Sequence, residues 1–205
     1  MKLYEFPPTR SIRVRWMLQE LEVDFESVIV NLPAGGSRDP EFLRINPAGK
    51  LPVLVDDGVV LTESVAIALY LAEKYPAKGF VPTDPAQRAQ LHRWLYFTVT
   101  ELEQPLWRIA RNSFVYPEEQ RVAADIPNAR REFVEMAAVL ERHMQMRQFV
   151  VGERASVADI VLAYTLDWAG EEELLDETPR LRAFMERMYA RPKAALRIAT
   201  AMQVK

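Results

Sequence analysis

Residues 46–64, with the sequence NPAGKLPVLVDDGVVLTES, decide the predicted fold of this chain. The apolar segments 51–55 and 59–61 have the length and composition of short strands. Between them lies Asp57-Gly58, a pair that is typical of the tight turn in a β-hairpin. We therefore predict two antiparallel strands joined by a hairpin turn.

Pro52 is unusual within a predicted strand, because proline has no N–H to donate and is confined to strand starts, edges or bulges. Two interpretations remain open. Periodicity alone favours an ordinary trans proline at the start of an edge strand. A cis Leu51–Pro52 bond, which is inexpensive only before proline, would instead turn the backbone of Leu51 outward toward a ligand.

Thr62-Glu63-Ser64 lies between the second strand and the apolar run 65–71, which we predict to be helical. Hydroxyls at a helix start can cap it, and the free N–H groups there form an anion site. Glu63 could also accept an ammonium group. The helix start and Glu63 together would therefore suit the α-carboxylate and the α-amino group of an amino acid. Simple caps with an acidic first turn explain the same residues equally well.

The segments before this stretch predict a parallel β-α-β unit. Residues 2–6 and 24–30 have strand patterns, and residues 9–21 between them have a helical apolar face. A crossover of this kind is right-handed and makes the two strands parallel. With a short helical piece at 40–43 and the hairpin, the order becomes β-α-β-α-β-β-α, which is a thioredoxin-like mixed sheet.

A proline-rich segment at 76–85 predicts a linker between a first domain, 1–75, and a helical domain, 86–205. The sequence SVAD at 156–159 is a capping box with Asp in place of Glu. The long amphipathic helices are expected at 86–112, 117–146, 157–173 and 179–190, with a short one near 194–202.

Composition excludes several classes of function. The chain of 205 residues is 49% hydrophobic and 27% charged, with a net charge of −3, which argues against a nucleic-acid partner. No cysteine is present, so any thiol must come from a ligand, and two histidines make a metal site improbable. The apolar runs are too short for a membrane span, and with no signal peptide expected, a cytoplasmic protein is the default.

The stretch Asn46 to Ser64 resembles the glutathione-binding half of the glutathione S-transferase family, whose pattern is NPxGK, a hydrophobic residue, P-x-L, a hairpin and then E/Q-S. The SVADI sequence at 156–160 is similar to the family's S/T-x-A-D-I motif. The resemblance covers nearly the whole chain. It implies an α/β thioredoxin-like domain followed by an all-α domain, and glutathione as the co-substrate.

The resemblance also implies roles for individual residues in glutathione binding. The backbone of Leu51, before a cis Pro52, would pair with the cysteinyl part of glutathione, and Glu63 with Ser64 would hold its γ-glutamyl end. Lys50 would meet the glycyl carboxylate, with Arg38 as a more distant candidate.

The loop from strand 2–6 into the first helix would stabilise the glutathione thiolate through helix N–H groups and a hydroxyl. Counting back from Arg13, the serine position of the family's serine-type loop falls on Thr9, and Ser11 is the next candidate. Arg10, which lies between them, is a further catalytic candidate, or else a solvated charge. Thr9 or Ser11 could instead be a helix N-cap, and Tyr4 is a weaker candidate for the donor.

The second substrate would be a small hydrophobic electrophile bound between the domains, and the resemblance implies a homodimer. The candidates for the wall of that pocket are Trp107, Arg108, Arg111 and Asn112. Glutathione-dependent reduction of disulfides or peroxides, isomerisation, and a non-catalytic glutathione-binding role remain open as alternatives to conjugation.

Overall fold

The computed structural model describes residues 1–203 and divides the chain into two compact units. One unit contains Met1–Val81 together with the segment that starts at Tyr189, and the other contains Pro82–Met188. The sequence pattern predicts one helical domain for residues 86–205. The structure differs at the carboxyl end, because the segment from Tyr189 onward packs on the first unit.

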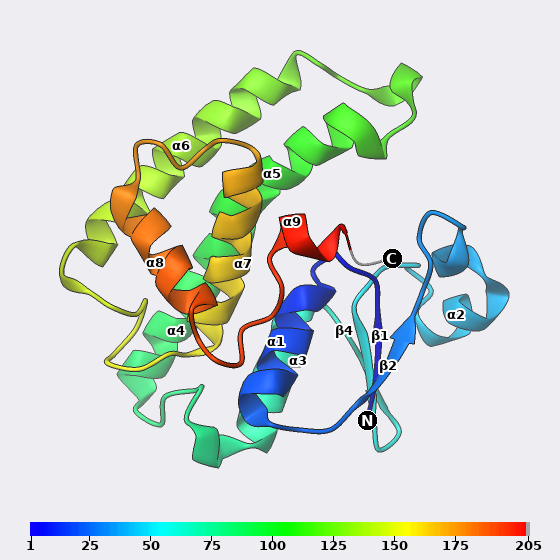
Figure 1. Cartoon of the computed structure of the whole chain (residues 1–205), viewed down its shortest axis with the longest axis horizontal. Coiled ribbons are helices and arrows are strands. Elements are labelled where there is room, and N and C mark those ends of the chain that lie inside the picture. The colour runs from blue at the N-terminus through cyan, green and yellow to red at the C-terminus, as the bar shows by residue number, and fades with distance from the viewer. Residues whose placement is uncertain (204–205) are drawn as a thin grey trace. The chain divides into compact units, whose positions relative to one another are not determined.

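The first unit is built on a four-stranded mixed sheet in the order β2-β1-β3-β4 (Figure 1). The strands are β1 (Lys2–Glu5), β2 (Glu26–Ile29), β3 (Val53–Asp56) and β4 (Val59–Thr62). β1 runs parallel to β2, whereas β1 with β3 and β3 with β4 are antiparallel. This arrangement confirms the predicted thioredoxin-like sheet and its hairpin.

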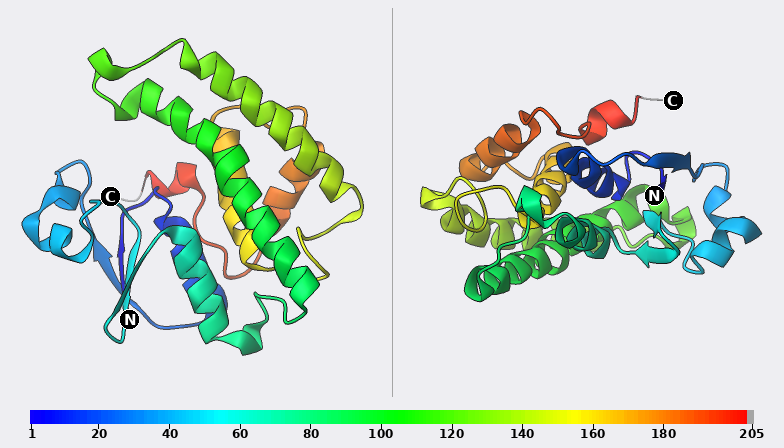
Figure 2. Two further views of the ribbon diagram at one scale, coloured as in Figure 1. Left: turned by 180° about the vertical axis from the view of Figure 1, so that it is seen from behind. Right: turned by 90° about the horizontal axis from the view of Figure 1, so that it is seen from below.

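Helices cover both faces of the sheet (Figure 2). α1 (Ser11–Leu21) and α3 (Ser64–Lys74) lie side by side on one face, and α2 (Pro40–Ile45) lies on the other. Tyr4 and Val53 pack against the α2 side in one apolar cluster. Because successive strand side chains alternate between faces, the fully buried Leu3 and Leu54 point toward α1 and α3.

The segment from Tyr189 onward, which includes α9 (Ile198–Ala201), packs on α1. The Tyr189 ring lies 4.7 Å from the ring of Trp16, centroid to centroid. Arg191 donates through Nε and Nη2 to the two carboxylate oxygens of Glu20, at 2.6 and 2.7 Å. This bidentate pair and the ring contact fix the end of the chain to the first unit.

The strand register brings several chain segments to one edge of the sheet. β1 ends where β3 begins, because Tyr4 pairs with Val53, and β4 ends at the same place, because Thr62 also pairs with Val53. β2 is parallel to β1, so its end lies at this edge too. The loops that follow β1, precede β3 and follow β4 therefore meet there.

The second unit is helical, with α4 (Pro85–Phe97), α5 (Glu103–Ala110), α6 (Asp125–His143), α7 (Val157–Glu171) and α8 (Pro179–Tyr189). The single helix predicted over 86–112 is wrong in detail, because a π-helical turn at Thr98–Leu102 separates α4 from α5. Pro105 explains this interruption, since proline removes a helical hydrogen bond and crowds the carbonyl four residues earlier.

The helix predicted over 117–146 starts later, at Asp125, after a loop that contains a short 3₁₀ turn at Glu118–Gln120. Pro127 accounts for the difference. It lies in the first turn of α6, where the backbone N–H is not needed, whereas a helix from residue 117 would have placed it in the interior.

The capping box before α7 is confirmed. The carboxylate of the fully buried Asp159 accepts hydrogen bonds from the backbone N–H of Ser156 and of Val150, both at 2.8 Å, and from the Ser156 hydroxyl at 2.6 Å. Burial raises the pKa of Asp159 to about 6, and these donors oppose that rise, so the carboxylate is ionised at neutral pH. The box thereby also ties the loop at Val150 to α7.

Among residues 1–203, no helix combines the length and the apolar composition that a membrane crossing requires. The longest, α6, contains 19 residues, but charged side chains are spread along it.

We expect Asp159→Ala to lower the free energy of unfolding by about 3 kcal/mol, because two buried backbone N–H groups lose their acceptor. Ser156→Ala removes one hydroxyl from the same box and should cost only about 1 kcal/mol. Urea denaturation at neutral pH measures both values. Equal losses in the two variants would contradict the assigned role of Asp159.

Candidate functional site

The Leu51–Pro52 peptide bond is cis, as the family resemblance implied, and the trans interpretation is wrong. The β1–β3 ladder begins at Val53, so Leu51 lies outside it. A proline at this point explains why the ladder stops, because Pro52 has no N–H to donate. The backbone of Leu51 thus lies at the sheet edge where the loops meet.

Two hydroxyls form a short hydrogen-bonded chain in the loop before α1. Thr9 Oγ1 donates to the carbonyl oxygen of Phe6 at 2.6 Å, and Thr9 Oγ1 and Ser11 Oγ lie 2.7 Å apart. Because a hydroxyl has one proton and that of Thr9 goes to Phe6, Ser11 is the donor in the second contact. Ser11 is buried, whereas Thr9 is half-buried.

The cap interpretation of these hydroxyls is partly right. Arg10 is the N-cap of α1, and its side chain makes no cap hydrogen bond. Thr9 Oγ1, however, accepts from the backbone N–H of Ser11, the first residue of α1, at 3.3 Å. Arg10 is half-buried at the same helix start, and its catalytic role stays a prediction.

Glu63 and Ser64 begin α3 at the same edge. Glu63 is the N-cap with φ 67° and ψ 112°, a backbone conformation that non-glycine residues rarely adopt, and its side chain makes no cap hydrogen bond. Ser64 is 6% exposed, while Glu63 is exposed. The acidic side chain is therefore accessible at the edge, whereas the serine is buried.

Arg13 is a site residue that the sequence reasoning missed. Its side chain is fully buried, and Nη1 donates to Ser64 Oγ at 3.3 Å, which joins α1 to the start of α3. An arginine between Ile12 and Val14 within a predicted apolar face is the signal that could have identified it. An arginine is almost never fully buried unless it is paired.

Arg38 and Lys50 lie close together through Gly49. Gly49 has φ +60°, and a Cβ built there would lie 2.8 Å from the carbonyl oxygen of Ser37 and 2.9 Å from Arg38 Nη1. Asn46 fixes this turn by donating to the carbonyl of Lys50 at 2.8 Å. Two exposed cationic side chains, those of Arg38 and Lys50, therefore lie next to Gly49, a position at which only glycine fits.

Tyr4 is not placed as a thiol donor. Its ring packs 6.1 Å from that of Phe42 within the apolar cluster under α2. Glu5, the next residue, is buried and accepts hydrogen bonds from Arg15 Nε at 3.0 Å and from the Ser27 hydroxyl at 2.6 Å. Tyr4 therefore stabilises the sheet by packing, and Glu5 stabilises it by hydrogen bonding.

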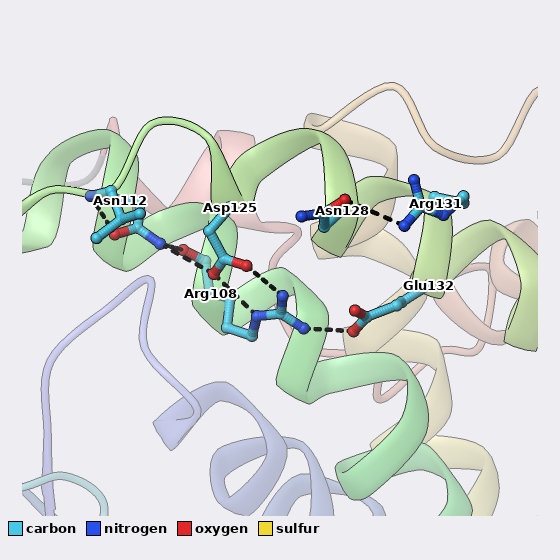
Figure 3. A network of polar contacts seen from close by, with 7 residues as sticks. Arg108, Asn112, Asp125, Asn128, Arg131 and Glu132 are labelled. Carbon is cyan, nitrogen blue, oxygen red and sulfur yellow. Dashed lines mark hydrogen bonds and ion pairs between the residues drawn. The ribbon is translucent and has the colours of Figure 1, made fainter.

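In the second unit, Arg108 and Asn112 belong to a polar network that joins α5 to α6 (Figure 3). Arg108 Nε donates to Asp125 Oδ2 at 3.0 Å, and its guanidinium also pairs with Glu132. This pairing holds the pKa of Asp125 below its usual range. Asn112 donates to Asp125 at 3.3 Å and accepts the N–H of Val122 at 3.0 Å.

Trp107 and Arg111 are the other two candidates for the pocket wall, and both are half-buried. The Trp107 ring meets the Trp168 ring edge to face at 6.5 Å, and Arg111 Nη1 donates to the hydroxyl of Tyr116 at 3.2 Å. Arg108 and Asn112 use their polar groups within the network of Figure 3. The electrophile-binding role of all four stays a prediction.

The site edge combines groups of complementary chemistry in one small region. Hydroxyls lie at the start of α1, and a carboxylate lies at the start of α3. The peptide group of Leu51 lies outside the β1–β3 pairing, and two cationic side chains are also present. No cluster of three or more histidine, cysteine or acidic side chains suited to a metal ion occurs within residues 1–203. Such a set can bind a zwitterionic peptide and lower the pKa of a thiol placed by Thr9.

Comparison with known proteins identifies the chain's relatives. The family model described as "Glutathione S-transferase, N-terminal domain" matches residues 1–73, and "Glutathione S-transferase, C-terminal domain" matches residues 102–192. Glutathione S-transferase GST-4.5 of Xanthomonas campestris is 30% identical over 192 residues, which cover 93% of each chain. The disulfide-bond oxidoreductase YfcG of Escherichia coli is 31% identical over 198 residues, 93% of this chain and 90% of that one.

A solved structure of a glutathione transferase homologue from Sulfitobacter, with bound glutathione, superposes with a TM-score of 0.84 at 26% identity and covers 98% of this chain and 96% of that chain. The two family models together match most of the sequence, and they match in the order of the two structural halves. The chain belongs to the glutathione S-transferase family.

Proposed function

We propose that this protein is a glutathione transferase that activates the glutathione thiol for attack on a small hydrophobic electrophile. The hydroxyl chain of Thr9 and Ser11 at the start of α1 is the observation that carries the proposal. It lies at the sheet edge beside Leu51, where the family places the cysteinyl part of the tripeptide.

Glutathione would bind along this edge by its three parts. The peptide group of Leu51 pairs with the cysteinyl backbone, and Glu63 with Ser64 holds the γ-glutamyl amine and carboxylate. Lys50 follows Gly49 in the chain and Arg38 lies against Gly49, and both bind the glycyl carboxylate. Each end of the ligand thus meets a group of opposite charge or a hydrogen-bond donor.

The chemical task is to deprotonate a thiol whose ordinary pKa is about 8.5. We assign the direct donor to Thr9, because it is the accessible hydroxyl, and a supporting role to buried Ser11. When a thiolate arrives, the Thr9 proton turns from the Phe6 carbonyl to the sulfur, while Ser11 continues to donate to Thr9 Oγ1. The positive end of α1 adds to this stabilisation.

The thiolate then attacks the electrophilic carbon, a carbon–sulfur bond forms, and the leaving group departs with its electron pair. The thiol proton goes to solvent. Trp107, Arg108, Arg111 and Asn112 remain the candidates for contacts with the electrophile. We also expect the homodimer that the resemblance implied and the cytoplasmic location that is the default for this sequence.

Disulfide reduction is the second candidate, and the similarity to the disulfide-bond oxidoreductase YfcG favours it. This chain has no cysteine, so every thiol would come from glutathione. One glutathione thiolate would attack the substrate disulfide and release the first substrate thiolate. A second glutathione thiolate would attack the mixed disulfide, form glutathione disulfide and release the second substrate thiolate. Parallel assays with an aryl halide and a mixed disulfide decide which reaction predominates.

We predict that Thr9→Val lowers kcat/KM for an aryl halide by about 10- to 100-fold at neutral pH, since one hydrogen bond to a charged sulfur is lost. The pKa of bound glutathione, read from thiolate absorbance in the ultraviolet, should rise by about one to two units in parallel. Ser11→Ala should give a smaller change in both quantities.

Thr9→Ser is the matched control, because it keeps the hydroxyl and should retain most of the activity. Full activity in Thr9→Val, with loss only in Ser11→Ala, would reassign the donor to Ser11. Glutathione binding with no turnover in the wild type, for either substrate, would instead identify a non-catalytic binding protein.

We predict that Gly49→Ala weakens glutathione binding by about tenfold, because the added methyl group forces Ser37 and Arg38 away from the turn. Gly58→Ala is the matched control. Gly58 also has a positive φ, +84°, but a Cβ there meets nothing within 4 Å. Both variants therefore share the backbone strain, and only Gly49→Ala adds a clash.

Isothermal titration calorimetry with glutathione measures this difference. Equal dissociation constants for the two alanine variants would show that the Arg38–Gly49–Lys50 turn does not contact the tripeptide.

A further inference from the structure

The second unit contains a cavity of about 480 Å³ that the proposed function does not use. It lies between the first turns of α4, the end of α6 and the loop 150–152. Its lining includes Gln87, Gln90, Arg93, Trp94, His143 and Arg147. The volume falls within the range of sites that hold small organic molecules.

The floor of this cavity is a fixed aromatic pair. The rings of Trp94 and His143 lie 4.1 Å apart, centroid to centroid, with 33° between their planes. His143 Nε2 contacts the carbonyl oxygen of Val150 at 2.8 Å, and Val150 in turn donates its N–H to Asp159. The His143 ring is therefore held by a loop that is itself tied to α7.

The cavity walls are cationic. Arg93 lies over Trp94, with its guanidinium carbon 4.7 Å from the ring centroid, and Arg147 lies on the loop beyond α6. None of the described lining residues is acidic. Three acids lie close to the lining along the chain. Glu153 follows Gly152 and is exposed, Asp84 caps α4 by accepting from Gln87 N–H, and Glu141 accepts from Arg180.

Trp94 presents apolar atoms to the cavity. The residue is 3% exposed, and its Nε1–H has no exposed surface and no hydrogen-bond acceptor among residues 1–203. A ligand in the cavity therefore does not reach this donor and meets the carbon atoms of the indole ring.

The titration of His143 is consistent with this charge distribution. Burial is the largest cause that lowers the pKa of His143, and the positive charges of Arg147 and Arg93 lower it further, against the hydrogen bond to Val150. Both arginines therefore lie near enough to lower the pKa of the ring, and an anion bound to them should raise that pKa.

We propose that this cavity binds a small organic anion, in which a carboxylate or phosphate group pairs with Arg93 and Arg147 and an apolar body lies against Trp94 and His143. The site is separate from the residues assigned to glutathione. Its occupation therefore stands whether or not the protein proves to be a transferase.

Nuclear magnetic resonance of the two histidines provides a direct test on the full chain. His92→Gln assigns the signals, since only His92 and His143 are present. Sodium benzoate is the probe, benzamide is its uncharged counterpart, and saturating S-methylglutathione is added to occupy the proposed glutathione site. We expect benzoate to move the His143 signals saturably and to raise the pKa of His143, and benzamide to do neither.

Arginine variants then test which guanidinium groups bind the carboxylate of benzoate. Arg93→Gln and Arg147→Gln should each weaken benzoate binding by about tenfold, as expected for loss of a charge-assisted hydrogen bond. Arg142→Gln removes the same charge from an exposed position next to His143, outside the cavity lining, and should change the affinity by less than about twofold.

Three results would overturn the proposal: no response of His143 to benzoate, an equal response to benzamide, or equal weakening in all three arginine variants. Circular dichroism of each variant verifies that the fold is retained. A response to inorganic phosphate as well as to benzoate would extend the ligand class to phosphates, and a response to benzoate alone would restrict it to carboxylates.

Discussion

The register of the β1–β3–β4 pairs is the constraint on which the site depends. Pro52 ends the ladder at Val53, and the same pairing places the end of β4 beside it. The loops at 6–11, 51–52 and 63–64 consequently share one sheet edge. A shift of one strand by a single residue would turn its side chains to the opposite face of the sheet and would displace its loop along this edge.

Arg13 connects that edge to the helices behind it. A fully buried guanidinium is stable only with hydrogen-bond partners, and one of them is the Ser64 hydroxyl at the start of α3. The two helix starts that flank the proposed thiolate and γ-glutamyl positions are therefore joined through a single side chain. This link explains why a charged residue is kept within an otherwise apolar helix face.

Much of the fold could be predicted from periodicity, turns and caps, including the mixed sheet, the hairpin and the capping box at Ser156. The cis bond at Pro52 could not be chosen from periodicity, because both isomers give the same pattern; the family motif indicated it. The interruption before Pro105 and the late start of α6 before Pro127 were missed because an amphipathic pattern continues across both places. The role of Arg13 depends on a contact 51 positions away in the sequence, which local patterns do not reveal.

The return of the carboxyl-terminal segment to the first unit affects how the protein is made. Tyr189 and Arg191 cover Trp16 and Glu20, yet they are synthesised after the whole helical unit. The sheet and α1 are made first, but one side of α1 stays uncovered until residues 189–191 have been added. Completion of the amino-terminal unit therefore depends on synthesis of the helical unit, and a nascent chain stalled within that unit would expose an indole to chaperones.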